Sequence, residues 1–462
     1  MAQFVPPYPY RLPASPSPWQ RINLARRNLL AQFEEQAFEC GFVASRLFAR
    51  DFFLCNSPDA VQFAFSTHND SFERKASGYR HTLKPLVGDG LFISDGQTWG
   101  IRRPIVASIL HISRLSQFAP VMVDAACEMR ERWAKLPEPA EIDALSEMAQ
   151  LTADVISRAL FGRQLGREHE LQIVEGFSEY RRRISQVDVM DLMGLPDWIP
   201  RPHLPGVYRT VKRIQSVVDD IIASCRINRD REDVSVIGQL LEARDESGGP
   251  LDARAIRNEV LVLFMAGHET TASTLAWIWY ILSQTPEVEA RLHDELDAIL
   301  AGRLPTLGDI PKLKYTRAIL DEVMRLYPPV PLLQREALRE EGFQEIRIRK
   351  GALIAVCPWL LHRHRQLWTK PDHFIPERFL PGGEEPVSKF AYVPFSIGPR
   401  ICAGMAFALT EAVLCIATLA QTFKFHLKPS HRVHAVCRLT VRPGDTLPMR
   451  LTPRQAPLSQ PA

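Results

Sequence analysis

The 462-residue sequence lacks several features that define large classes of proteins. No run approaches the roughly 18 apolar residues of a membrane-spanning helix, and the N-terminus lacks the apolar stretch of a signal peptide. The net charge is only +3, from 56 Lys and Arg against 53 Asp and Glu, which does not indicate nucleic-acid binding. The eight cysteines form no Cys-x-x-Cys pair, so neither a disulfide framework nor a cysteine-rich metal site is expected. We therefore expect a monomeric, cytoplasmic protein without a membrane anchor or a nucleic-acid partner.

The sequence also lacks the signs of a multidomain chain. No Gly/Ser-rich linker, internal repeat or long charged run divides it, and a hydrophobic content of 46% can supply one large core. Only the first 20 residues differ, because they carry prolines at positions 6, 7, 9, 13, 16 and 18. Such a segment has few backbone donors and is expected to lie extended over the surface. We predict a proline-rich arm over residues 1–20 and one domain over residues 21–462.

Hydrophobic periodicity and turn residues predict the main elements of the domain. Helical patterns occupy residues 24–38, 116–162 (two helices), 169–229 (two helices around a proline-rich stretch, 195–205), 252–283 and 312–327. Strands are expected within residues 42–54 and 423–451, and a loop over residues 69–95. Ser57 and Pro58 have the character of an N-cap followed by a first helical residue. The helix over 252–283 would be about 48 Å long at about 1.5 Å per residue, enough to cross the domain.

One cysteine near the C-terminus stands in a distinctive setting. Cys402 lies between Gly398 and Gly404, behind Arg400 and ahead of an apolar helical run. Backbone N–H groups and the positive end of the helix dipole favour the thiolate, which is the form that binds a metal. Gly398 permits a turn with positive φ, Gly404 allows close approach of a flat macrocycle, and Arg400 can pair with a propionate of that macrocycle. The run predicts a haem-thiolate loop, and the alternative is a buried structural cysteine on a glycine-rich turn.

With Phe395, these positions spell Phe-x-x-Gly-x-Arg-x-Cys-x-Gly, which resembles the haem-binding signature of cytochrome P450 enzymes. The resemblance implies a mainly α-helical fold with small β-sheets, in a single triangular domain. Haem would lie between a long central helix and the helix that follows the cysteine loop. The implied cofactor is haem b, with Cys402 as the axial iron ligand and dioxygen as a co-substrate.

The long predicted helix contains Ala266, Gly267, His268, Glu269 and Thr270 in succession. The small residues leave room for a flat group, and the Thr270 hydroxyl can reach the carbonyl of Ala266 and bend or open the helix. The pattern resembles the oxygen-binding groove of P450 enzymes, in which Glu269 would pass protons inward and Thr270 would be the alcohol beside dioxygen. The alternative is a Glu-Thr pair on an ordinary helix. We assign no ligand role to His268.

Three more positions resemble propionate-binding residues of the family. Trp99 and Arg103 are four residues apart and share a helix face, and Arg335 lies 16 residues before Gly351. Without the cysteine loop, Arg103 on its helix would be interpreted as an ordinary solvated residue.

A charge network is implied by two further motifs of the family. Glu322 and Arg325 form a Glu-x-x-Arg motif on one helix face, and Arg378 belongs to a Pro-Glu-Arg-Phe motif. In P450 enzymes these three side chains form a buried network close to the proximal side of the haem. Outside that context, a pair three residues apart is usually a surface salt bridge.

The substrate pocket is predicted from apolar or small residues at positions where the family contacts substrate. These residues are Phe92, Ala266, Val330 and Leu439. Their character favours a small hydrophobic substrate, although Phe92 is equally a candidate for a core position. Arg181, Arg182 and Arg183 are interpreted as a solvated helix face, with steering of a carboxylate as the alternative.

The resemblance implies a monooxygenase that inserts one oxygen atom of O2 into its substrate with electrons ultimately from NAD(P)H. The sequence contains no flavin or iron–sulfur segment, so a separate ferredoxin or flavodoxin is expected, with Arg102 and Lys389 as candidate contacts. Two alternatives are a peroxygenase or isomerase of the same fold, which usually lacks the acid–alcohol pair, and a haem-based sensor or electron carrier. Neither of these would require the pair formed by Glu269 and Thr270.

Overall fold

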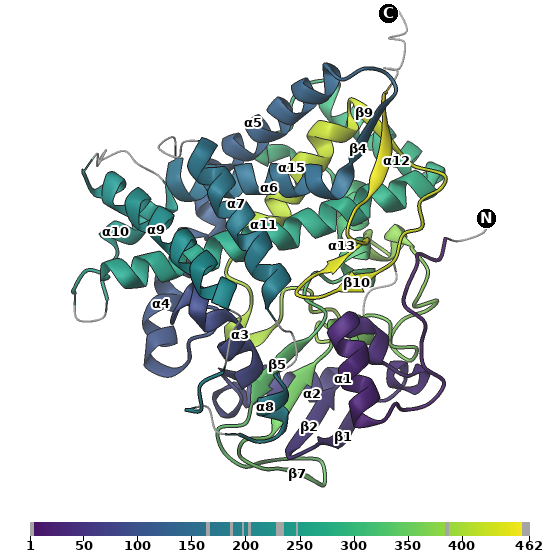
Figure 1. Cartoon of the computed structure of the whole chain (residues 1–462). Helices are drawn as coiled ribbons and strands as arrows, with labels where there is room; N and C mark the ends of the chain where they lie inside the picture. The colour runs from purple at the N-terminus through teal and green to yellow at the C-terminus, as the bar shows by residue number, and fades with distance from the viewer. Residues whose placement is uncertain are drawn as a thin grey trace, which may run out of the picture.

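A computed structural model describes residues 4–162, 167–184, 188–195, 198–201, 205–227, 235–245, 248–383 and 388–454. Helices dominate and fill the wider part of the molecule, whereas the strands β1, β2 and β5 lie at its lower end in Figure 1. The predicted mainly α-helical architecture with small β-sheets is therefore confirmed.

Several helices pack against a long central helix, α11. The longer helices are α1 (Pro18–Arg27), α3 (Ser77–Val87), α4 (Gly96–Ile109), α5 (Leu115–Ala134), α6 (Ala144–Phe161), α7 (Arg167–Arg183), α9 (Pro205–Ile227), α11 (Ala253–Gln284), α12 (Pro286–Leu300), α13 (Lys314–Leu326) and α15 (Met405–Ala420). The shorter ones are α2 (Pro58–Gln62), α8 (Val189–Leu192), α10 (Val236–Glu242) and α14 (Pro358–Leu361).

Four small sheets accompany the helices. The largest has the strand order β1-β2-β8-β5-β3, in which only β2 and β8 are parallel. Its strands are β1 (Phe42–Leu47), β2 (Arg50–Cys55), β3 (Arg74–Lys75), β5 (Leu333–Glu336) and β8 (Leu353–Val356). A second sheet orders β4 (Ala140–Asp143), β12 (Pro448–Pro453) and β9 (Phe423–Leu427). Two hairpins join β6 (Glu341–Phe343) to β7 (Ile346–Ile348) and β10 (Val436–Cys437) to β11 (Val441–Arg442).

The central helix matches its prediction to within a residue at each end. Asp252 caps it by accepting a hydrogen bond from the backbone N–H of Ala255 at 2.6 Å. Helices α6, α9, α13 and α15 all pack against it, which explains why it is apolar on most sides. Its C-terminal half is held by aromatic stacking of Trp277 on Tyr327 and of Trp279 on Phe425, at ring-centroid distances of 3.5 and 4.3 Å.

Two local predictions were wrong. Residues 69–95 are not a continuous loop, because α3 forms within them and buries Leu83, Leu86 and Val87 between α9 and α11 despite Pro85. Residues 24–38 are not one helix, because Asn28 is extended, with φ −156° and ψ 112°. The Asn28 side chain accepts from the N–H of Leu30 and so starts a separate 3₁₀ turn, while its amide binds the carbonyl of Ala435. Contacts from distant segments outweigh the local helical pattern in both places.

The described part of the N-terminal arm, residues 4–17, is tied to the body of the molecule. The Leu12 N–H donates to the carbonyl of Phe33, and the Tyr327 hydroxyl donates to the carbonyl of Pro7 at 2.6 Å. The Arg11 guanidinium lies 3.9 Å from the centroid of the Phe38 ring. Helix α1 begins at Pro18, within the segment predicted to be extended.

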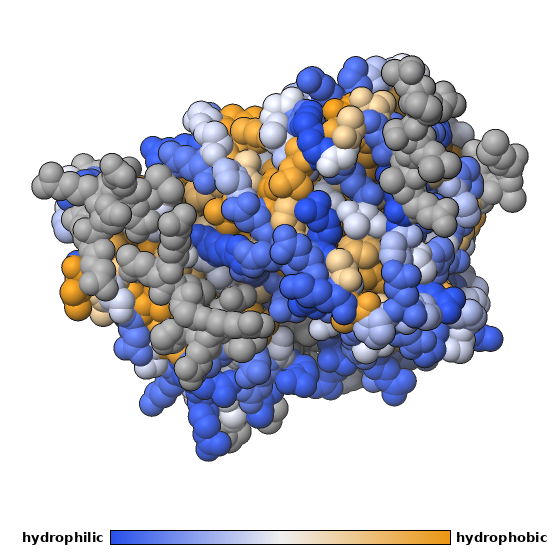
Figure 2. All heavy atoms as spheres, turned by 90° about the horizontal axis from the view of Figure 1, so that it is seen from above, coloured by the Kyte–Doolittle hydropathy of each residue, from blue (hydrophilic) through white to orange (hydrophobic). Residues whose placement is uncertain are grey.

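The surface drawn in Figure 2 is mostly hydrophilic, with smaller hydrophobic areas between the polar ones. None of the described helices alone has the length and apolar composition needed to cross a membrane. Helices α4 and α5, bent by 40° at their junction, meet that test only when they are joined. Each of the two buries residues such as Val106 and Phe118 in the core.

Candidate active site

The cysteine loop approaches α15 through a tight turn. Gly398 has φ +73°, and a Cβ atom at this position would collide with the carbonyl oxygen of Phe65, so only glycine fits. The Cys402 N–H donates to the carbonyl of Phe395 at 2.9 Å, which closes the loop just before α15 begins. At Gly404, by contrast, the only heavy atom within 4 Å of an added Cβ is Cδ1 of Leu110, at 3.8 Å. The packing of the described residues therefore requires glycine at position 398, whereas it leaves room for a larger side chain at position 404.

The Cys402 side chain is accessible to solvent and yet surrounded by protein. Burial raises the pKa of its thiol, whereas the N–H of Gly404 and the charges of Arg103 and Lys75 act in the opposite direction. Burial outweighs these opposing effects, so the pKa of the free thiol is raised, and coordination to a metal would be what deprotonates it.

Four cations converge near this cysteine. Arg335 and Arg400 are 1% and 7% exposed, and in the described structure Nε and Nη2 of each have no hydrogen-bond partner. Burial and the charge of Arg400 lower the pKa of Arg335 to about 9. Arg103 is half-buried. Burial lowers its pKa, and the nearby Cys402 acts in the opposite direction. Buried guanidinium N–H groups without acceptors are costly, so an anionic group such as the propionates of haem fits this place.

The neighbours of Arg400 are consistent with that fit. Its Nη1 donates to the carbonyl of Ser94 at 2.8 Å, and its guanidinium lies 4.5 Å from the centroid of the Trp99 ring. Glu73 is 3.7 Å from Nη2, which offsets part of the positive charge. The structure thus brings Trp99, Arg103, Arg335 and Arg400 of the predicted haem set close to one another, and Arg103 close to Cys402.

Sequence reasoning missed the fourth cation, Lys75. It lies on the two-residue strand β3 directly opposite Arg335 on β5. Burial first, and then the charges of Arg335 and Arg400, lower the pKa of Lys75 to about 7, while Cys402 opposes that effect. A two-residue strand has no recognisable periodicity, so only the strand pairing could reveal this contact.

We expect a Lys75→Met variant to release haem about tenfold faster than the wild type, because one charge-assisted contact to a propionate is lost. The measurement is haem transfer to an excess of apomyoglobin. Lys84→Met is the matched control, since Lys84 is an exposed lysine in α3. Equal transfer rates for Lys75→Met and the wild type would contradict the assignment.

The predicted contact of the Thr270 hydroxyl is present in α11. Thr270 Oγ1 donates to the carbonyl of Ala266 at 2.6 Å, although the helix stays α-helical throughout. Ala266 is exposed, whereas a Cβ atom at Gly267 would come within 2.9 Å of Ile156 on α6. Gly267 therefore serves close packing of α6, and the free space lies on the side of Ala266 and Thr270.

Glu269 precedes Thr270 on α11 and contacts the C-terminal segment of the chain. Its Oε1 accepts a hydrogen bond from the hydroxyl of Thr440 at 2.8 Å. Glu269 lines a cavity of about 250 Å³ together with Leu439 and residues of α6 and α7. Hydrophobic lining comes from Leu83, Leu145, Phe177, Tyr180, Ile184 and Met265.

The predicted substrate residues do not all line this cavity. Leu439 does, at the turn between β10 and β11. The Phe92 ring is half-buried and lies 4.9 Å from Nζ of Lys75, beside the cation cluster. Val330 is half-buried after the end of α13. Phe92 thus lies beside the cluster of cations near Cys402 and also packs against the hydrophobic core.

The predicted charge network is brought together in the interior. Glu322 and Arg325 are both 0% exposed and are joined by two hydrogen bonds, Nε to Oε2 at 2.6 Å and Nη2 to Oε1 at 2.8 Å. Nε of Arg378 lies 3.4 Å from Oε1 of Glu322. Arg325 also donates to three main-chain carbonyls, those of His362, Pro371 and His373. The pair therefore ties α13 to the segment that precedes the cysteine loop.

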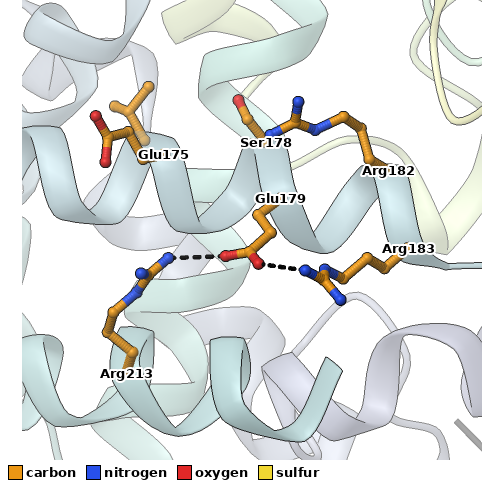
Figure 3. Close-up of a pocket in the computed structure, with 7 residues that line it drawn as sticks. Glu175, Ser178, Glu179, Arg182, Arg183 and Arg213 are labelled. Atoms are coloured by element: carbon orange, nitrogen blue, oxygen red, sulfur yellow. Dashed lines mark hydrogen bonds and ion pairs between the residues drawn. The ribbon is translucent and has the colours of Figure 1, made fainter. Parts of the chain in front are cut away.

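The larger described cavity, about 760 Å³, is a polar groove between α7 and α9. Figure 3 shows Glu179 between Arg183 and Arg213, and each guanidinium is 2.9 Å from its carboxylate. Arg182 and Arg183 are exposed, as expected for a solvated helix face. The Arg181 side chain lies outside the described residues. None of the residues that line this groove belongs to the predicted haem site.

One predicted partner contact was wrong. Arg102 is 8% exposed, and it pairs with Glu259 at 2.9 Å and with Asp89 at 3.0 Å. Its charge is used inside the protein to join α4, α11 and the segment before α4, so it cannot meet a redox partner. Lys389 is exposed, with Nζ 5.2 Å from the centroid of the Phe390 ring.

Comparisons with known proteins agree with these features. Residues 12–443 match the sequence profile of the family described as Cytochrome P450. Cyclooctatin synthase of Streptomyces melanosporofaciens is 32% identical over 419 residues, which cover 89% of this chain and 88% of that protein. Pentalenene oxygenase of Streptomyces avermitilis is 28% identical, with 84% and 85% covered. The crystal structure of the cytochrome P450DA heme domain is similar with a TM-score of 0.80 and 25% identity, covering 98% of this chain and 99% of that one.

Proposed function

The chain belongs to the cytochrome P450 family, and we propose that it is a haem-thiolate monooxygenase acting on a hydrophobic, cyclic terpenoid-type substrate. The observation that carries the proposal is Cys402 at the start of α15, beside buried arginines with unused N–H groups. Relatives named cyclooctatin synthase and pentalenene oxygenase support the substrate class. Hydrophobic residues in the wall of the cavity beside Glu269, such as Leu145, Phe177 and Leu439, are consistent with it.

Cys402 would hold the haem iron. The cations of the site, which are Lys75, Arg103, Arg335 and Arg400, would hold the propionates, with Trp99 stacked against the last of them. When bound, the haem supplies activation of dioxygen, because a thiolate ligand pushes electron density toward the iron and favours O–O cleavage. The protein's contribution is to hold substrate and to control access of water and protons.

Glu269 and Thr270 are the proposed proton-handling pair. Glu269 lines the cavity and is placed to take up a proton from that side. Thr270 commits its own hydroxyl hydrogen to Ala266, so its oxygen is oriented to accept a hydrogen bond on the side of the free space. Glu269 would supply the proton, and the Thr270 oxygen would accept a hydrogen bond from a water molecule that passes the proton on to the free space beside Ala266.

A Thr270→Val variant is expected to keep its fold, haem and substrate binding but to lose most of its product per electron pair. Valine keeps the shape and removes the hydroxyl, so oxygen leaves as hydrogen peroxide while NAD(P)H oxidation continues. Thr274→Val is the matched control, because its hydroxyl also donates to the carbonyl four residues back, at 3.0 Å. Product, peroxide and NAD(P)H are measured together, and equal coupling in Thr270→Val and the wild type would refute the role.

The substrate class is tested by binding. Cyclic terpene hydrocarbons and alcohols are expected to shift the Soret band on titration, and straight-chain acids of equal carbon number to shift it less. Incorporation of one atom from labelled O2 into the product then distinguishes a monooxygenase from an isomerase. Turnover supported by peroxide alone would favour the peroxygenase alternative.

We propose that electrons arrive through a separate ferredoxin or flavodoxin. The supporting observation is Lys389, which is an exposed cation near the cysteine loop in sequence. Reconstitution with each partner class decides between the two. A Lys389→Glu change should weaken the productive partner more at low salt than at high salt.

A further inference from the structure

The turn between β10 and β11 contacts the face of α11 that carries Glu269. Two neighbouring residues of the turn have different environments, because Leu439 lines the cavity and Thr440 is 3% exposed. The Thr440 hydroxyl donates to Oε1 of Glu269 at 2.8 Å across 171 residues of sequence. A side chain that lines the cavity and one that touches the acid are therefore adjacent in the chain.

We propose that Thr440 is a positioning residue for Glu269. It holds the carboxylate at the wall of the cavity, where Glu269 takes up a proton before passing it toward Thr270. This inference rests on the proposed acid role of Glu269. It assigns to Thr440 a part in proton delivery that follows from the position of its hydroxyl.

Three physical properties support the assignment. A hydroxyl donor stabilises the ionised form of a carboxylate, and the bond is stronger away from bulk water. Thr440 is buried, so water competes little for its hydroxyl. Threonine is branched at Cβ and therefore has few side-chain rotamers, which keeps the donor aimed in one direction.

The hydrogen bond also holds the turn against α11. The test must therefore distinguish the effect of losing the hydroxyl donor from the effect of changing the packing of the side chain. Thr440→Val keeps the shape and removes the donor, whereas Thr440→Ser keeps the donor and removes a methyl group. Thr446→Val is the matched control, because Thr446 is an exposed threonine in the same C-terminal segment. Each variant is prepared as the full-length, haem-loaded protein.

We expect Thr440→Val to form product about tenfold more slowly, the size of effect expected for a hydrogen bond to a charged group. The charged groups that line the same cavity, Asp143, Arg442 and Asp445, are unchanged in this variant. Loss of the donor alone removes stabilisation of the ionised carboxylate, so the low-pH limb of the product profile moves toward higher pH. Thr440→Ser should stay within about twofold of the wild type in rate, and Thr446→Val should be unchanged. If Thr440 only held the turn against α11, Thr440→Val would lower the stability of the protein without shifting the low-pH limb of its product profile.

Infrared spectroscopy supplies a measurement that does not depend on turnover. The carboxylate band of Glu269, identified by its loss in Glu269→Gln, should shift in Thr440→Val and keep its position in Thr440→Ser. The double variant Thr440→Val/Glu269→Gln should be no slower than Glu269→Gln alone, because Thr440 acts through the acid function that Glu269→Gln has already removed.

Several results would overturn the proposal. An unshifted band in Thr440→Val, equal impairment of the serine and valine variants, or additive effects in the double variant would each do so. If Glu269→Gln itself leaves coupling and the pH profile unchanged, the acid role in the proposed function fails. If Glu269→Gln is impaired and Thr440→Val matches the wild type, only the role of Thr440 is refuted.

Discussion

Replacement of Cys402 by alanine is expected to abolish the red-shifted Soret band of the reduced, CO-bound protein and all monooxygenase activity. The wild type should contain one b-type haem and show that band, because only a thiolate ligand produces it in this family. Alanine provides no ligand atom, so the thiolate on which the band depends is lost. The effect is therefore complete loss of the signal.

The measurement is the CO difference spectrum of the purified variant, with haem content determined separately. Cys40→Ala is the matched control, since Cys40 is a half-buried cysteine far from the loop in sequence and should leave the spectrum unchanged. Persistence of the red-shifted band in Cys402→Ala would show that another residue ligates the iron. Loss of the band in Cys40→Ala would show that the spectrum reports folding and not ligation.

The second large effect is expected from Glu322→Ala or Arg325→Ala. Each change leaves a partner charged and buried, which typically costs about 3–5 kcal/mol. Domains are usually stable by only about 5–15 kcal/mol, so either variant should give little folded, haem-loaded protein. Arg325→Ala also strands the carbonyls of His362, Pro371 and His373 without their donor.

The same helix offers a matched control for this prediction. Arg317 pairs with Asp321 at 2.7 Å on α13, but its side chain is 41% exposed. Removing Arg317 should therefore change the free energy of unfolding by less than about 1 kcal/mol. Yield, haem content and urea unfolding are compared among the three variants. Normal yield and haem loading in both Glu322→Ala and Arg325→Ala would mean that the pair carries no more stability than a surface bridge.

The elements predicted most accurately are those specified by neighbouring residues. The cap at Asp252 and the long apolar pattern after it are local signals, and α11 begins and ends within one residue of the prediction. The hydroxyl bond from Thr270 to Ala266 spans one helical turn, so helix geometry alone predicted it. The positive φ of Gly398 likewise follows from a glycine in a tight turn.

The errors and omissions involve contacts between distant segments. Arg102 was expected at the surface, but Glu259, 157 residues away, neutralises it in the interior. Lys75 joins the cation cluster through the pairing of β3 with β5, and a two-residue strand leaves no pattern in the sequence. Helix α3 forms where few periodic residues are visible, because α9 and α11 cover its apolar side chains.

The sequence by itself determined the family, and it predicts the iron ligand and the acid–alcohol pair, because these motifs depend on residue types at short, constant spacings. Only the tertiary structure decided which cations surround Cys402 and that Glu269 is held by Thr440 at the wall of a cavity. It also showed that Gly267 makes room for Ile156. The physical reason is that hydrogen bonds and charges act over a few ångströms in space, whereas sequence patterns report only neighbours along the chain.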